Sequence, residues 1–144
     1  MLERFAMIKI TKERSVSIDD VLHLYQAVGW TNYTNQPQML EQSLTHSLAI
    51  YVARDGEEIV GLVRLVGDGF SSIFVQDLIV LPSYQRQGIG SSMMKEALAD
   101  YKGAYQVQLA TEQTEKTLGF YRSLGFETLS TYDCTGMIWV DRKK

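Results

Sequence analysis

Residues 75–101 constrain the fold more than any other part of the chain, because they join a strand pattern to a helix pattern through a glycine-bearing loop. Residues 75–81 form an apolar run with only two polar members, as expected of a buried strand. After Gly88 and Gly90, apolar residues recur at helical spacing along residues 89–101. The order is therefore strand, loop, helix.

This loop has the composition of an anion-binding site. The first N–H groups of a helix lack partners, and the helix dipole adds partial positive charge there. Glycines let several N–H groups converge on one anion without a Cβ in the way. A phosphate or pyrophosphate is the natural occupant, although Gly88 and Gly90 could equally serve the turn alone.

Two common phosphate-binding motifs do not fit these residues. A P-loop requires Lys-Ser or Lys-Thr after its last glycine, and neither follows Gly88 or Gly90. The dinucleotide fingerprint requires a third small residue where Met93 stands.

The six residues from Gln85 to Gly90, QRQGIG, instead resemble the acetyl-CoA signature Q/R-x-x-G-x-G/A of the GNAT superfamily of N-acetyltransferases. The flanking strand and amphipathic helix agree with this resemblance, which covers nearly the whole chain. It implies an α/β (α+β) fold with a mixed central sheet flanked by about four helices. The chain is expected to form a single domain, residues 1–144.

The hydrophobic pattern predicts an element order that matches the GNAT fold. Strands are expected at residues 5–10 (at an edge), 48–54, 59–66, 75–81, 104–110, 126–129 and 135–140, and helices at residues 18–28, 37–47, 89–101 and 114–124. The strand at 104–110 should pair parallel to the central strand through a right-handed crossover. Ser17 is expected to begin a capping box.

The resemblance also implies where acetyl-CoA binds. In the GNAT fold the central strand and the next parallel strand splay apart, and the pantetheine arm lies between them. The backbone of Leu78, Ile79 and Val80 is then expected to contact the pantetheine and the acetyl group. The amides of Gln87, Gly88, Ile89, Gly90 and Ser91 become the pyrophosphate cradle. Arg86 either adds a charge contact or lies on a solvated loop.

A second motif lies at residues 118–126, LGFYRSLGF, and resembles the family's Y-x-x-x-G-F. By that match Tyr121 is the candidate general acid. When an amine attacks the thioester carbonyl, a thiolate leaves, and a nearby hydroxyl can protonate it. The alternative is a core tyrosine. Where the family often has an asparagine contacting the cofactor, this chain has Thr114, which could make a similar hydrogen bond or cap the helix.

The amine must also lose a proton. Asp77 is the first candidate base, because an acidic group in an apolar run must face a cavity or a partner; a salt bridge is the alternative. Glu112 is the second candidate, while His23 and His46 are expected to be structural. The acceptor side is expected at residues 30–36, where Trp30 and Tyr33 could stack on an aromatic or cationic amine, or fold inward as anchors.

Composition bounds the remaining possibilities. The net charge of −3 gives no sign of a basic surface that would bind nucleic acid, and Cys134 is the single cysteine. No spacing of His, Asp and Glu residues suggests a metal site, and no apolar run is long enough to span a membrane. We therefore expect a cytoplasmic monomer or homodimer that transfers the acetyl group of acetyl-CoA directly to the primary amine of a small molecule or peptide. The alternative is a catalytically silent acyl-CoA-binding module.

Overall fold

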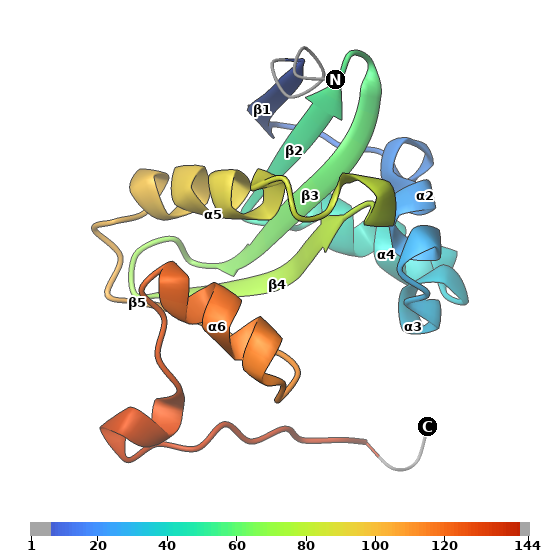
Figure 1. Ribbon diagram of the computed structural model, residues 1–144. Helices are drawn as coiled ribbons and strands as arrows, with labels where there is room; N and C mark the ends of the chain where they lie inside the picture. The colour runs from blue at the N-terminus through green and yellow to red at the C-terminus, as the bar shows by residue number, and fades with distance from the viewer. Residues whose placement is uncertain (1–6, 142–144) are drawn as a thin grey trace. The chain divides into compact units, whose positions relative to one another are not determined.

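The computed structural model describes residues 7–141 (Figure 1). The chain divides into two compact units, the first ending at Leu109 and the second beginning at Ala110. Within the described residues, the first unit contains the whole sheet, and the second contains one α-helix and the C-terminal segment. Among those residues, no helix has both the length and the apolar character needed to cross a membrane. The expectation of a single domain stays a prediction.

The sheet of the first unit is mixed and has five strands in the order β1-β2-β3-β4-β5. Their bounds are β1 Ile8–Glu13, β2 Ala49–Asp55, β3 Glu58–Gly67, β4 Ser72–Val80 and β5 Gln106–Leu109. Strands β1 to β4 pair antiparallel, and β5 pairs parallel to β4, as predicted. The first strand lies at an edge, as predicted, but runs further along the chain; residues 5 and 6 of that prediction lie outside the described residues.

Four α-helices accompany this sheet within the described part of the first unit: α2 Ile18–Ala27, α3 Thr31–Thr34, α4 Pro37–Thr45 and α5 Ile89–Asp100. Three of them were predicted. The short helix α3 was not, because its sequence is polar and lacks helical periodicity; backbone bonds such as Thr34 N to Trp30 O, at 3.1 Å, close it. Ser17 is the N-cap of α2, but its side chain makes no capping hydrogen bond, so the predicted capping box is absent.

The helices cover both faces of the sheet. Leu24 of α2 and Leu40 and Leu44 of α4 share one apolar cluster with Val52 and Leu62 of the sheet. On the other face α5 crosses the strands (Figure 1), and it lies so close that a Cβ on Gly61 of β3 would be 2.9 Å from the Met93 side chain. A glycine at this point of β3 therefore permits the close packing of α5 against the sheet.

The second unit contains α6 Glu115–Ser123 and the 3-10 helix η2 Leu129–Tyr132. The predicted helix at residues 114–124 is confirmed. The predicted terminal strands at 126–129 and 135–140 are wrong, since the first leads into η2 and the second has no regular structure. A strand needs a paired neighbour to satisfy its backbone, and within the described residues the sheet ends at β5.

Candidate functional site

A bulge interrupts the pairing of β4 with β3. Arg64 pairs with Asp77 and Leu65 pairs with Val75, so Gln76 is an extra residue on β4. A bulge bends its strand and changes the local twist. It also falls immediately after Val75, the last residue of β4 that pairs with β5. The pairing of β4 with β5 therefore ends at the bulge.

Beyond this point, residues 76–80 of β4 have no strand partner on the β5 side among the described residues. Backbone groups of successive strand residues alternate between the two sides. Leu81 N donates to Val60 O of β3 at 2.9 Å, so the backbone groups of Leu81 face β3. By alternation, the backbone groups of Val80 and Leu78 point to the opposite, open side. The Gln85 side chain, whose Nε2 donates to Val80 O at 3.0 Å, confirms this direction. An open strand edge of this kind offers hydrogen bonds to an extended ligand.

The alternation corrects one part of the predicted contact set. Ile79 pairs with Leu62 of β3, so its backbone groups face β3, and its side chain is buried in the core. The backbone groups of Leu78 and the N–H of Val80 remain available for a ligand, while Val80 O already accepts from Gln85 and Ile79 faces β3.

The loop after β4 has an unusual backbone that suits an anion. Arg86 and Gly88 both have left-handed backbone angles, with φ of 64° and 79°. Gly88 is the N-cap of α5, and the amide of Ser92 is the first in the helix to bond back, to Gly88 O at 2.9 Å. The amides of Ile89, Gly90 and Ser91 precede that bond and have no helical acceptor. Such alternation of backbone angles turns successive N–H groups toward a common point.

The space beside Gly88 is open, since a Cβ built there would meet no heavy atom within 4 Å. The predicted cradle of Gln87 to Ser91 therefore has both the donors and the room for a phosphate group. Arg86 lies exposed beside it.

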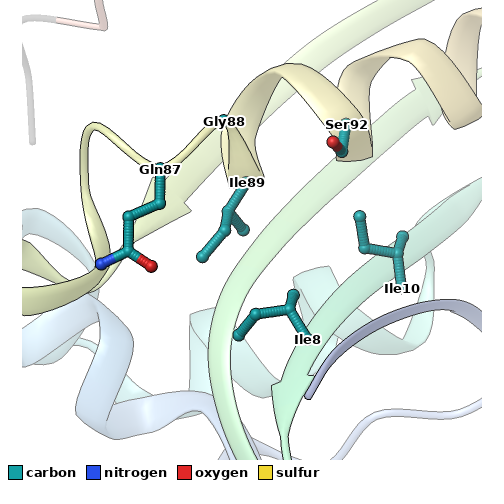
Figure 2. Close-up of a pocket in the computed structure, with 6 residues that line it drawn as sticks. All are labelled: Ile8, Ile10, Gln87, Gly88, Ile89 and Ser92. Carbon is teal, nitrogen blue, oxygen red and sulfur yellow. The ribbon is translucent and has the colours of Figure 1, made fainter. Parts of the chain in front are cut away.

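A small pocket lies at the same end of α5. It has a volume of about 170 Å³ and is lined by Ile8, Ile10, Gln87, Gly88, Ile89 and Ser92 (Figure 2). None of these residues belongs to β4, and the volume is below that of ordinary ligand pockets. The pocket is thus a recess between β1 and the helix start, distinct from the open edge of β4.

Asp77 lies in a buried polar cluster with Arg64, Tyr25 and Tyr33. This cluster joins strands β3 and β4 to helices α2 and α3. Its Oδ2 accepts hydrogen bonds from Arg64 Nε and from Tyr25 Oη, both at 2.8 Å, and its Oδ1 accepts one from Tyr33 Oη at 2.9 Å. Arg64 is 4% exposed and Asp77 is 3% exposed. This is the salt bridge that sequence reasoning left open as the alternative to a catalytic base. A carboxylate held by three donors is poorly placed to take a proton from a substrate.

The two tyrosines of this cluster stay protonated. Burial, followed by the charge of Asp77, raises the pKa of Tyr25 and that of Tyr33 above their ordinary value. Tyr33 is 7% exposed, and Trp30 packs against the core cluster, with its ring centroid 6.1 Å from that of Tyr25. Both aromatic residues are therefore loop anchors here, and their predicted stacking on an acceptor is not supported.

In the second unit, Tyr121 is half-buried. Its ring packs edge-on against Phe120 and Phe126, with centroids 5.0 Å and 5.9 Å away. Burial raises the pKa of the Tyr121 hydroxyl above its ordinary value of 10, and a hydrogen bond with the Thr111 side chain partly offsets this. The hydroxyl is therefore a proton donor at neutral pH, as a general acid requires.

Thr114 has a clear structural role. It is the N-cap of α6, and its Oγ1 accepts a hydrogen bond from Thr117 N at 3.2 Å. The capping alternative is thus confirmed, while its predicted contact with the cofactor stays a prediction. Glu112 is exposed in the same unit.

Sequence reasoning missed the buried cluster as a unit. One signal for it existed: Arg64 is a lone charge in the apolar run of β3, just as Asp77 is in β4. Two opposite charges in adjacent buried strands indicate a pair.

A mixed sheet whose central strand opens at a bulge and leads through a glycine-bearing loop into a helix is typical of the acyltransferases of the GNAT fold. A family profile described as an acetyltransferase (GNAT) domain matches residues 46–128, and the chain belongs to this family. A GNAT-family acetyltransferase from Streptococcus pneumoniae TIGR4 is 74% identical, with 94% of this chain and 99% of that chain covered and a TM-score of 0.88. A probable acetyltransferase from methicillin-resistant Staphylococcus aureus, 24% identical over 94% of this chain and all of that chain, shares the fold with a TM-score of 0.76.

Curated plant proteins are also similar. Serotonin N-acetyltransferase 2 of rice is 32% identical over 63% of this chain, and GCN5-related N-acetyltransferase 1 of Arabidopsis thaliana is 28% identical over 90% of it; both are chloroplastic. The chain spans 48% and 65% of the lengths of these two proteins. The predicted cytoplasmic location stays a prediction.

Proposed function

We propose that this protein is an acetyl-CoA-dependent N-acetyltransferase that passes the acetyl group directly to a primary amine. The observation that carries this proposal is the open edge of β4 at Leu78 and Val80, which leads directly to the free amides at the start of α5. The first feature suits an extended amide-bearing chain, and the second suits a pyrophosphate. A GNAT acetyltransferase from Elizabethkingia anophelis, with a TM-score of 0.62, is known with acetyl-CoA bound.

The names of related proteins support an amine acceptor but differ in its kind. The rice protein is a serotonin N-acetyltransferase, and a structural neighbour of TM-score 0.64 is an aminoglycoside acetyltransferase in complex with sisomicin. The acceptor of this chain is proposed only as a primary amine of a small molecule or peptide.

The proposed reaction uses few residues. The amine nitrogen forms a bond to the thioester carbonyl carbon, the carbon–sulfur bond breaks, and Tyr121 gives its proton to the departing sulfur. The proton lost by the amine passes to solvent, because the three donors on Asp77 leave it no part in this step. No residue is proposed to bind a metal.

The most direct test is a screen of primary amines that follows release of free thiol from acetyl-CoA. Amine-dependent release supports the transferase. A silent acyl-CoA-binding module would bind CoA in calorimetry and release no thiol with any amine.

Replacing Gly88 with aspartate should weaken CoA binding at least about 100-fold, because a carboxylate would enter the anion site. The fold should survive, since aspartate tolerates a left-handed backbone and a Cβ at this position meets open space. Calorimetric titration with CoA measures the effect. Gly103→Asp makes the same change in an exposed turn and should leave the affinity unchanged. Equal affinities of Gly88→Asp and wild type would place the cradle elsewhere.

A further inference from the structure

The loop between β4 and α5 contains a strained residue immediately before the proposed cradle. Arg86 has a φ of 64°, in the left-handed region that residues with a Cβ seldom adopt. Such a conformation costs free energy and persists only where the surrounding structure holds it. Arg86 lies two positions before Gly88, the N-cap of α5, so a change in its backbone angles would redirect the amides of the cradle. The contacts that fix the chain ahead of Arg86 therefore also fix the cradle.

The segment ahead of this residue is the short 3-10 helix η1, Pro82–Tyr84. Its own backbone bonds, Tyr84 N to Leu81 O at 2.8 Å and Gln85 N to Pro82 O at 3.3 Å, are local and shape only the turn. The bond from the Gln85 side chain to β4 is exposed, so water competes for both of its groups. A buried contact fixes η1 to the sheet more firmly.

Tyr84 supplies this buried contact. Its side chain is 4% exposed, and its hydroxyl donates to Asp55 Oδ2 at 2.5 Å, across 29 positions of the chain. Asp55 is the last residue of β2, where the chain turns into β3. A hydrogen bond from a hydroxyl to a carboxylate is shorter and about twice as strong as one between neutral groups. The bond therefore ties the loop before the cradle to the β2–β3 hairpin of the sheet.

We propose that Tyr84 and Asp55 are positioning residues for the pyrophosphate of CoA, because their hydrogen bond holds the loop so that the amides at the start of α5 converge on the anion before it binds. Neither side chain has to touch the ligand. A cradle formed in advance spares binding the cost of ordering the loop. This inference rests on the proposed function, and it makes the affinity for CoA depend on a residue of β2, outside the glycine-bearing loop.

The first test compares two probes, CoA and pantetheine, which shares the arm of CoA but lacks its pyrophosphate. Both titrations are followed by NMR of the isotope-labelled full-length protein. Tyr84→Phe keeps the ring and removes only the hydroxyl, so the affinity for CoA should fall about tenfold, the scale of one charge-assisted hydrogen bond. The affinity for pantetheine should not change. An equal loss for both probes would mean that the fold is loosened in general, and it would overturn the proposal.

Tyr51→Phe is the matched control for this variant. Tyr51 is also buried, and its hydroxyl also donates to a carboxylate, Asp100 Oδ2 at 2.6 Å, at the end of α5 opposite to the cradle. Its loss should leave the affinity for CoA unchanged. Asp55→Asn keeps an acceptor and should lose less affinity for CoA than Asp55→Ala does. When Asp55→Ala is already present, Tyr84→Phe should have little further effect, because the bond that they share is gone.

The same titrations separate failure of this inference from failure of the proposed function. A wild type that does not bind CoA would overturn the proposed function and the positioning role together. A wild type that binds CoA, with Tyr84→Phe binding it equally well, would overturn the positioning role alone. A loss that is selective for CoA and absent in Tyr51→Phe supports both.

Discussion

Replacing Asp77 with alanine should lower the free energy of unfolding by about 3–5 kcal/mol, the scale for breaking a buried ion pair. The change leaves the guanidinium of Arg64 buried without its carboxylate and removes the acceptor of both Tyr25 and Tyr33. Because the cluster joins β3 and β4 to helices α2 and α3, the loss should loosen the packing of these helices on the sheet. Urea denaturation followed by circular dichroism measures the effect.

Two further variants separate charge burial from simple loss of packing. The double variant Arg64→Ala/Asp77→Ala should be less destabilised than the sum of the two single variants, since no unpaired charge remains buried. Glu13→Ala breaks the ion pair with Arg54, in which the Arg54 side chain is 34% exposed and the Glu13 side chain 26%, and should cost no more than about 1 kcal/mol. If Asp77→Ala is as mild as Glu13→Ala, Asp77 does not hold this part of the fold together.

Replacing Tyr121 with phenylalanine should lower kcat by roughly 100-fold or more, the usual effect of losing a positioned acid. The ring and its contacts with Phe120 and Phe126 are kept, so stability and CoA affinity should change little. The loss should appear in kcat rather than in KM, as for an interaction made in the transition state. Steady-state kinetics with the best amine of the screen provides the measurement.

The pH dependence gives an independent readout of the same residue. Because burial raises the pKa of Tyr121, the alkaline fall of kcat should lie at higher pH than it would for an ordinary tyrosine. The phenylalanine variant should lack this limb. Tyr132→Phe removes the hydroxyl of an exposed tyrosine in the same unit and serves as the matched control. Full turnover by Tyr121→Phe would show that solvent protonates the sulfur.

Local chemistry was enough to predict most of the elements. The alternating apolar patterns predicted the β2–β3 hairpin, and the strand, glycine loop and helix pattern of residues 75–101 predicted β4, the loop after it and α5. Gly88 is found at the helix start with the positive φ that glycine accommodates most easily. These features depend on residues that are neighbours in sequence, so the pattern contains the information that decides them.

The sequence did not decide the roles of Asp77, Tyr33 and Trp30, because these depend on partners distant in the chain. Asp77 meets Tyr25 across 52 positions and Tyr33 across 44, and no local pattern reveals such contacts. The same reason explains why the strand predicted at residues 135–140 is absent. Its composition predicted a strand, but a strand forms only where a second strand supplies hydrogen bonds, and the described residues of the chain supply none there.

The sequence by itself thus determined the family, the order of most elements and the position of the glycine-bearing loop at the start of α5, since each follows from spacing along a short stretch. The tertiary structure decided which backbone groups of β4 lack a strand partner. It also decided that the carboxylate of Asp77 is held in a buried ion pair. A one-residue bulge at Gln76 and the packing of α2 and α3 against the sheet produce both results. Such results arise from pairing between distant segments, where each residue's role depends on what the folded chain places beside it.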